Sequence, residues 1–212
     1  MTINTEELTK VDGFWCRPGT TDHYAVAETR RIFRKEGAPQ SGDVCLDLGA
    51  HIGSFSGRAV SAGASIVAVE PEPTNCDMFR LNVPDTPLIE AAVGPYPDEY
   101  VDLYLSSTYG HTTVKTNRSR PSIHVPTVSF EELCYAHQPT FIKIDVEGAE
   151  YDLDLPRSIP TSCDRVFIEF HLTFGNRPLG KALRSAFLSA GWHPLWENGS
   201  PDRANMEGVF TR

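Results

Sequence analysis

The sequence lacks any long run of apolar residues. No stretch approaches the roughly 18 consecutive apolar residues that a membrane-spanning helix needs. The first ten residues are polar and acidic, so they lack the basic and then apolar layout of a secretory signal. We therefore expect a cytoplasmic protein without a membrane segment.

Cysteine is scarce and widely spaced. None of the five cysteines belongs to a Cys-x-x-Cys pair, and their odd number does not suit a set of disulfide bridges. We expect neither a zinc site nor a disulfide framework. In a reducing compartment such thiols serve as small apolar side chains; they are Cys16, Cys45, Cys76, Cys134 and Cys163.

Positive charge is also in short supply. The chain has 19 Lys and Arg against 28 Asp and Glu, which gives a net charge of −9. Proteins that bind nucleic acids usually carry a basic patch, and the one local basic cluster, Lys115, Arg118 and Arg120, is most simply a solvated loop. We expect a small-molecule substrate, no nucleic-acid partner, and a monomer or homodimer.

Strand-like and helical patterns alternate along most of the 212 residues. Short apolar runs that end at glycine or proline predict strands, and segments with one apolar face predict helices. The alternation predicts a single α/β domain with a mostly parallel sheet covered by helices on both faces. The predicted strands are 44–48, 65–70, 88–93, 140–145, 165–170, 192–196 and 206–211, and the predicted helices are 22–37, 54–62, 74–82, 130–137, 149–155 and 179–190.

Two segments stand apart from this alternation. Residues 1–43 form a predicted N-terminal helical cap on a core of residues 44–212. Within the core, residues 95–127 alternate in polarity but are interrupted by Gly110 and Pro121. This pattern predicts an insertion of irregular hairpins or loops on the substrate side.

A glycine-containing loop, residues 47–53, joins the first predicted strand of the core to its helix. Gly49 allows a sharp turn and a close ligand, and Gly53 allows the helix to pack on the strand. Dinucleotide-binding folds place three glycines here for a pyrophosphate, whereas this loop has two, and Asp47 would repel a pyrophosphate. The acid suits the positive amino and sulfonium groups of S-adenosylmethionine (SAM), with Ala50 and His51 as further contacts. Taken alone, the loop also fits a generic turn.

A second acid follows the next predicted strand. Glu70, with Pro71 beside it, lies 23 residues after Asp47. A carboxylate at this position accepts hydrogen bonds from both ribose hydroxyls of an adenosine cofactor. Sites for nicotinamide cofactors use the same device, but the combination with the Asp47 loop favours SAM.

The candidates for chemistry follow two later strands. Asp145 ends the strand over 140–145, at the edge where we expect the cofactor, and is the leading candidate for a general base. Glu169 and His171 are two residues apart, so they share a face of the next strand and are candidates for acceptor contacts, with His171 also suited to proton transfer. Glu147 is a third catalytic candidate, although it and Glu150 also fit a plain interaction with a helix N-terminus.

Two further features are open to interpretation. Tyr109 and His111 lie in the irregular stretch, and we expect them to contact substrate, although an ordinary polar turn also fits. Some O-methyltransferases use a divalent metal to activate the acceptor hydroxyl. Because nothing in the residue spacing requires an ion, we predict no metal site.

Several motifs together resemble the FkbM-type methyltransferases over nearly the whole chain. The resemblance implies a Rossmann-like class I methyltransferase fold with seven strands and an antiparallel C-terminal strand, SAM as cofactor with Ala92 among its contacts, and most often O-methylation of a sugar or natural product. At His51 the family commonly has asparagine. The motifs are Arg17-Pro-Gly-Thr-Thr-Asp22, Asp47-Leu-Gly-Ala-His-Ile-Gly53, Val69-Glu-Pro-Glu-Pro73, Ala91-Ala-Val-Gly94, Val125-Pro-Thr-Val-Ser-Phe-Glu-Glu-Leu133, Phe141-Ile-Lys-Ile-Asp-Val-Glu-Gly-Ala-Glu150 and Phe167-Ile-Glu-Phe-His171.

Other classes of enzyme fit the sequence less well. A nicotinamide-dependent oxidoreductase should have the three-glycine loop and often a Tyr-x-x-x-Lys pair, and the sequence has neither. Enzymes that methylate nucleic-acid or protein nitrogen often carry an Asn/Asp-Pro-Pro-Tyr-like segment after the fourth strand, where this chain has Asp145-Val-Glu-Gly148. An N-methyltransferase for small molecules and a non-catalytic SAM-binding module stay open as alternatives.

Overall fold

The structure, a computed structural model, describes residues 5–97, 100–106, 111–114, 120–172, 177–200 and 205–212. Its centre is a seven-stranded sheet with the strand order β11-β12-β10-β9-β3-β4-β5. Only β12 runs antiparallel to its neighbours, β10 and β11, which confirms the predicted α/β class. The strands are β3 (Val44–Leu48), β4 (Ser65–Val69), β5 (Leu88–Ile89), β9 (Phe141–Ile144), β10 (Arg165–His171), β11 (His193–Gly199) and β12 (Asn205–Thr211).

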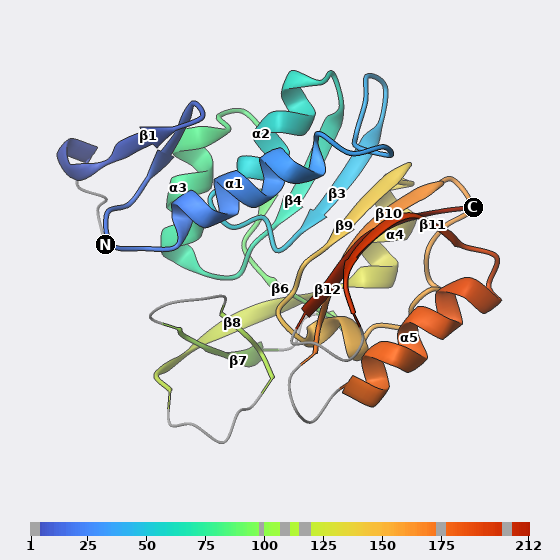
Figure 1. Ribbon diagram of the computed structural model, residues 1–212. Helices are drawn as coiled ribbons and strands as arrows, with labels where there is room; N and C mark the ends of the chain where they lie inside the picture. The colour runs from blue at the N-terminus through green and yellow to red at the C-terminus, as the bar shows by residue number, and fades with distance from the viewer. Residues whose placement is uncertain (1–4, 98–99, 107–110, 115–119, 173–176, 201–204) are drawn as a thin grey trace.

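Helices cover both faces of this sheet (Figure 1). Apolar side chains of α1 (Asp22–Ile32), α2 (Ser54–Ser61) and α3 (Pro73–Asn82) pack on one face. Side chains of α4 (Phe130–His137) and α5 (Arg177–Ser189) pack on the other. Neighbouring residues of β3 show the underlying alternation, because Cys45 joins the first core and Leu46 joins the second. No helix within the described ranges is both long and apolar enough to cross a bilayer.

Three predicted elements differ from the observed ones. The first helix ends at Ile32 rather than at Gly37, because the backbone N–H groups of Arg34 and Lys35 bond to carbonyls three residues back and tighten the chain into turns. The predicted helix over 149–155 is only a 3-10 turn, η2 (Ala149–Tyr151), and Pro156 disfavours helical backbone at the residue before it. The predicted strand 88–93 is split, since the chain leaves the main sheet after β5 and enters a second sheet at β6 (Ala92–Gly94).

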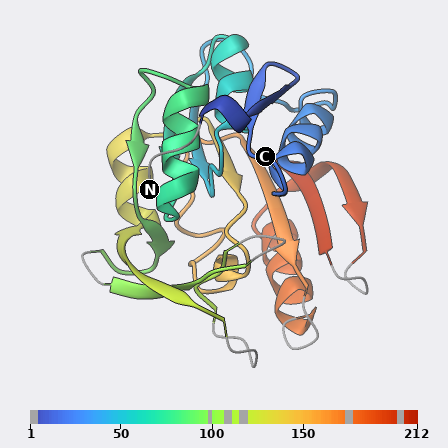
Figure 2. The same cartoon turned by 90° about the vertical axis from the view of Figure 1, so that its left-hand side faces the viewer.

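The second sheet contains much of the predicted insertion. Its order is β6-β8-β7, with β7 (Tyr100–Tyr104) and β8 (Ser122–Ser129) antiparallel and β6 parallel to β8. These strands are regular rather than irregular, because Ala92, Leu103 and Val125 form a small core of their own. Two of its strands, β7 and β8, lie in the lower left part of the molecule in both views (Figures 1 and 2).

The N-terminal segment is more than the predicted helical cap. A 3-10 turn, η1 (Thr5–Glu7), and a hairpin of β1 (Thr9–Val11) and β2 (Phe14–Cys16) precede α1. The hairpin is fixed to α3 by the amide of Asn82, which accepts a hydrogen bond from the backbone N–H of Trp15 and donates to its carbonyl oxygen. The same amide donates to the carbonyl oxygen of Ile52, so the hairpin is also tied to the glycine loop.

Candidate active site

A cavity of about 650 Å³ opens at the carboxyl ends of the central parallel strands, within the range of about 300–1,000 Å³ that is typical of ligand pockets. The strand order reverses between β3 and β9, since β4 and β5 lie on one side and β10 on the other. Open α/β sheets bind ligands at such a switch point. Side chains of α1, β7 and the segment 111–114 complete its walls.

The loop after β3 can turn this sharply only because residue 49 is glycine. Its φ is +78°, and a Cβ there would lie 1.8 Å from the carbonyl oxygen of Asp145. The backbone N–H groups of Gly49 and Ala50 both donate to the carbonyl oxygen of Val69, each at 3.0 Å. The loop therefore holds the ends of β3, β4 and β9 close together at the cavity.

Asp47 does not face the cavity, contrary to the expectation from the sequence. Its side chain is fully buried, accepts a hydrogen bond from the hydroxyl of Ser56 at 2.6 Å, and lies 3.2 Å from Nζ of Lys143. Burial opposes the charge of Lys143, but the carboxylates of Asp47 and Asp145 outweigh it and raise the pKa of the ammonium. Asp47 thus lies beneath the loop because it neutralises a buried lysine, which donates to the carbonyl oxygen of Gly49 at 2.8 Å.

The other predicted cofactor contacts divide into two groups. Ala50 and Gly53 do not line the cavity: Ala50 is buried in the core, and Gly53, with a φ of +85°, packs against Phe79. The remaining residues of the set line the cavity; they are Gly49, His51, Glu70, Pro71, Ala92 and Asp145.

Glu70 is held firmly at one end of the cavity, called here the Glu70 end. Its Oε2 accepts a hydrogen bond from the backbone N–H of His51 at 2.8 Å. Its Oε1 accepts hydrogen bonds from the backbone N–H of Glu72 at 3.0 Å and from the amide of Asn75 at 3.1 Å. Burial raises the pKa of Glu70, and these three donors act against that rise.

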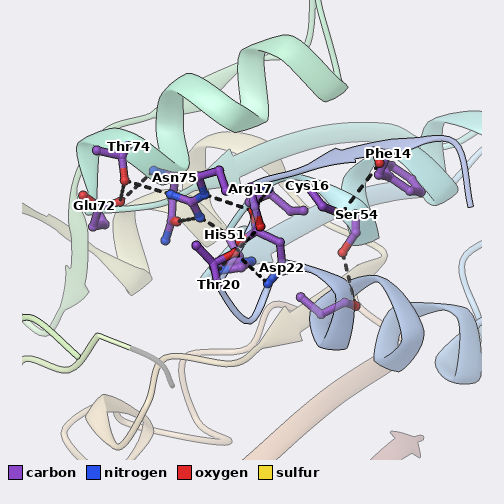
Figure 3. Close-up of polar contacts among 12 residues, drawn as sticks. Phe14, Cys16, Arg17, Thr20, Asp22, His51, Ser54, Glu72, Thr74 and Asn75 are labelled. Carbon is purple, nitrogen blue, oxygen red and sulfur yellow. Dashed lines mark hydrogen bonds and ion pairs between the residues drawn. The ribbon is translucent and has the colours of Figure 1, made fainter. Parts of the chain in front are cut away.

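Arg17, to which the sequence analysis assigned no role, lies among Asp22, Thr74 and Asn75 (Figure 3). Arg17 donates to both oxygens of Asp22 through Nε and Nη2, at 2.9 and 2.8 Å. It also donates to the hydroxyl of Thr74 at 2.8 Å and to the amide oxygen of Asn75 at 2.6 Å. Because the same amide donates to Glu70, the chain Asp22–Arg17–Asn75 orients the carboxylate.

His51 lies between the glycine loop and α1. It has a φ of +52°, a left-handed conformation that asparagine and histidine adopt more readily than most residues. Its Nε2 lies 3.8 Å from Oδ1 of Asp22, and its buried Nδ1 has no hydrogen-bond partner among the described residues. Burial lowers the pKa of the imidazole to about 4, so the ring is neutral at physiological pH.

The opposite end of the cavity brings four of the predicted residues together, and we call this group the acidic end: Asp145, Glu147, Glu169 and His171. The imidazole Nε2 of His171 lies 3.3 Å from a carboxylate oxygen of Glu147, 3.7 Å from Asp145 and 3.8 Å from Glu169. They meet because β9 and β10 are neighbouring parallel strands, and three carboxylates thus surround one imidazole.

Glu150 fixes the position of this imidazole; the sequence had suggested that it interacts with a helix N-terminus. Its side chain is fully buried, and Oε1 accepts the backbone N–H of His171 at 2.8 Å and lies 3.3 Å from the ring Nδ1. Burial opposes a charge on His171, but Glu150 and Glu147 outweigh it and raise the pKa of the ring well above its usual value. The ring therefore holds its proton at neutral pH, whereas the sequence favoured a proton acceptor.

Burial also raises the pKa values of the carboxylates around His171. It raises the pKa of Glu147, and it raises that of Glu169 further, with the charge of Asp145 adding to both shifts. On α1, Glu28 also faces the cavity, and burial together with Asp145 raises its pKa to about 7. Carboxylates with raised pKa values are better proton acceptors than ordinary ones.

The segment 111–114 closes the cavity beside the acidic end. His111 lines the cavity as predicted, and its Nδ1 accepts a hydrogen bond from the backbone N–H of Ser106 at 3.0 Å. The hydroxyl of Thr112 donates to the carbonyl oxygen of Glu147 at 2.6 Å and so fixes Glu147, whose φ is +54°. The predicted contact Tyr109 lies outside the described residues, as do Lys115 and Arg118 of the basic cluster.

Sequence reasoning missed Lys143, Arg17 and the cavity-lining face of α1. Lys143 had a usable signal, because it is the lone charge inside an otherwise apolar strand and lies on the same face as Asp145 two residues later. Glu28 and Arg31 of α1 had none, because the helical pattern does not say which strand ends its polar residues will meet.

The strand order, the glycine turn after β3 and the acid after β4 define a class I SAM-dependent methyltransferase. The cavity residues fit SAM, because Glu70 presents a fixed carboxylate and Gly49 leaves room for a ligand at the backbone.

Comparisons with known proteins name the family. The model of the FkbM methyltransferase domain matches residues 47–191, and the chain belongs to this family. No curated protein matches the chain.

Solved structures resemble the fold at low sequence identity. The C-terminal domain of precorrin-6Y C5,15-methyltransferase from Rhodobacter capsulatus is 14% identical, with a TM-score of 0.52 over 90% of this chain and 89% of that one. Precorrin 8W decarboxylase from Methanobacterium thermoautotrophicum is 13% identical, with a TM-score of 0.50 over all of both chains. Fibrillarin from Aeropyrum pernix, solved with natively bound SAM, is 10% identical, with a TM-score of 0.50 over 88% of this chain and 74% of that one.

Proposed function

We propose that this methyltransferase transfers the methyl group of SAM to a hydroxyl of a small molecule, such as a sugar or another natural product. The observation that carries the proposal is the acidic end, where three carboxylates line one end of the cavity around a single imidazole. Carboxylates accept hydrogen bonds from hydroxyl groups and take up their protons. A neutral, polyhydroxylated acceptor suits such a surface.

The Glu70 end would hold the cofactor. Glu70 offers its carboxylate to a ribose hydroxyl, because a carboxylate has about four acceptor positions and the chain fills three of them, which leaves one. Gly49, His51, Pro71 and Ala92 would contact the rest of the molecule. When bound, SAM supplies a methyl group that is activated by attachment to a positive sulfonium.

The acidic end would then position the acceptor and take its proton. The hydroxyl oxygen forms a bond to the methyl carbon while the bond between carbon and sulfur breaks, which leaves S-adenosylhomocysteine. The hydroxyl proton passes to a carboxylate of the acidic end. Orientation of the two reactants accounts for about 7–11 kcal/mol of the barrier, and proton removal for about 3–5 kcal/mol. The shape of the cavity therefore contributes more than any one base.

A matched pair of acceptor panels tests the reaction. The purified chain is incubated with SAM and either hydroxylated acceptors (methyl glycosides and hydroxylated macrolactones) or analogues with one hydroxyl replaced by an amine. We expect S-adenosylhomocysteine to form with members of the first panel and NMR to locate the new methyl group on oxygen. Methylation of the amines alone would assign the chain to N-methylation. SAM binding without turnover on either panel would indicate a non-catalytic module.

A further inference from the structure

Three groups of the acidic end have the composition of a metal site. Asp145, Glu147 and His171 each present one ligand atom, and these atoms lie within 4.8 Å of one another. We propose that these three residues bind one divalent cation, Mg²⁺ or Mn²⁺, which holds an oxygen of the methyl acceptor. The second half of this proposal rests on the proposed function, whereas binding of the ion does not.

The spacing of the ligand atoms is close to what such an ion needs. Ligands lie about 2.0–2.1 Å from Mg²⁺ in an octahedron, so neighbouring ligand atoms are about 3 Å apart. Nε2 of His171 lies 3.3 Å from Oε2 of Glu147 and 3.7 Å from Oδ1 of Asp145. The other oxygen of Asp145 already pairs with Lys143 at 3.3 Å, so Asp145 has one oxygen for the ion. Side-chain shifts of less than about 1 Å would complete the geometry.

The surroundings of His171 are those of a metal-ligating histidine. Such a histidine almost always gives its second ring nitrogen to a carboxylate or carbonyl, which fixes the orientation of the ring. Here Glu150 lies 3.3 Å from Nδ1 and also accepts the backbone N–H of His171. Glu150 is itself fixed, because its other oxygen accepts the backbone N–H of Gly148 at 2.8 Å. The buried ring is therefore held with Nε2 towards the two carboxylates.

A second acidic trio in the same region makes an informative contrast. Glu28, Glu169 and Glu207 also bring ligand atoms together, but they include no imidazole. Arg31 already lies 2.5 Å from a carboxylate oxygen of Glu207. This trio therefore lacks the imidazole ligand and has one carboxylate held by an arginine, which leaves the Asp145 group, with its oriented imidazole, as the better cation site.

The donor set determines the class of ion. Two carboxylates and one imidazole favour a hard cation, whereas none of the sulfur ligands that select softer metals is part of the group. Three protein ligands leave coordination positions for water or for acceptor oxygens in the cavity. A bound cation would take the place of the proton on Nε2 of His171, because a ligating imidazole is neutral, and would relieve the repulsion among the carboxylates.

Mn²⁺ binding to the chelator-treated full chain tests the site without SAM or acceptor. Calorimetry and electron paramagnetic resonance should show one ion per chain, with spin-echo modulation from a coordinated imidazole nitrogen. His171→Asn should abolish the nitrogen modulation. Glu147→Gln, at a half-buried side chain, should weaken binding at least as much as Glu150→Gln, for which we expect a loss of about 10–100-fold. Glu28→Gln, in the second trio, is the matched control and should bind Mn²⁺ like the native chain.

The outcomes separate this proposal from the proposed function. Binding that does not saturate at one ion per chain, or a nitrogen signal that survives His171→Asn, would overturn the metal site. So would a loss of binding in Glu28→Gln together with full binding in Glu147→Gln. Thermal unfolding with and without SAM identifies any variant that fails to fold, and Glu147→Gln then carries the test. A chain that binds the ion but methylates no hydroxyl would overturn the proposed function and the ion's role in holding the acceptor, and would leave the metal site itself standing.

Discussion

The two ends of the cavity both present carboxylates to a ligand, but they satisfy them in different ways. At the Glu70 end, two backbone N–H groups and one amide donate to a single carboxylate, and Arg17 holds that amide in place. At the acidic end, three carboxylates face one imidazole at 3.3–3.8 Å. The carboxylate of the first end is held in one orientation before a ligand arrives, whereas the second end gathers negative charge that a ligand relieves. Changes at the first should affect binding, and changes at the second should affect turnover.

The largest effect should come from Asp145→Asn at the acidic end. The substitution keeps the size of the side chain but removes a carboxylate that we propose takes the proton of the acceptor. We expect kcat to fall by about 10²–10⁴-fold, with the SAM dissociation constant changed much less. Rapid-quench kinetics and calorimetry measure the two quantities. Asp152→Asn, at an exposed residue outside the cavity lining, is the control; a fully active Asp145→Asn enzyme would remove Asp145 from the mechanism.

Glu70→Gln should produce the opposite pattern. In glutamine only one of the two terminal atoms can accept hydrogen bonds, whereas both oxygens of Glu70 accept them. The site therefore loses a charge-assisted hydrogen bond to the ribose, and one N–H donor of the chain is left without a good acceptor. Hydrogen bonds to charged groups contribute about 1.5–3 kcal/mol, and we expect SAM affinity to fall by about 100-fold. At saturating SAM, kcat should stay within a few-fold of native. Glu90→Gln, an exposed acid that pairs with Arg80, is the control, and equal losses of kcat and affinity would erase the contrast between the two ends.

A smaller effect should follow from Arg17→Lys behind the Glu70 end. Lysine keeps the charge but cannot reproduce the planar fork that contacts Asp22, Thr74 and Asn75 together. The amide of Asn75 then loses its orientation towards Glu70. We expect SAM affinity to fall about tenfold, or about 1.4 kcal/mol, with little change in kcat. Arg80→Lys on the exposed side of α3 should leave calorimetric affinity unchanged.

Most of the fold could be predicted from the sequence because its periodicity is strong. The strands β3, β4, β9, β10 and β12 and the helices α2, α3, α4 and α5 lie within two residues of their predicted bounds. The failures have different causes: η2 stops short before Pro156, whereas the split between β5 and β6 marks the point where the chain crosses from one sheet to the other. Such crossings are set by tertiary packing, which the residues alone do not show.

The site was predictable residue by residue but not as a network. Glu70, Asp145 and His171 follow strands, so their position at the carboxyl edge follows from the fold. The inward direction of Asp47 does not, because it depends on Lys143 being its partner in the register of β3 and β9. The contact between Glu150 and His171 likewise requires β9 and β10 to be neighbours and the chain to fold back at η2.

The smallest expected effect is a change in the pH dependence of folding stability. It concerns His51, a neutral imidazole at the Glu70 end, in contrast to the charged imidazole of His171 at the acidic end. The charges of Asp22 and Asp145 raise the pKa of the ring and those of Arg17 and His111 lower it, but burial has the largest effect and lowers the pKa to about 4. The unfolded chain therefore binds a proton at residue 51 near pH 6.5 that the folded chain binds only near pH 4. Stability from this residue is thus complete above pH 6.5 and is lost as pH falls towards 4.

His51→Asn removes this contribution and keeps a side chain that tolerates the left-handed backbone. Between pH 8 and pH 6 the native chain should lose about 0.5–1 kcal/mol more stability than the variant, as measured by urea unfolding at the two pH values. His137→Asn, at the end of α4 and away from the cavity, should keep the native pH dependence. Parallel losses in native and His51→Asn chains would mean that the ring takes up a proton in the folded state. The Glu70 end would then contain a group, His51, that changes its charge in the folded chain, and the contrast with the acidic end would be weaker.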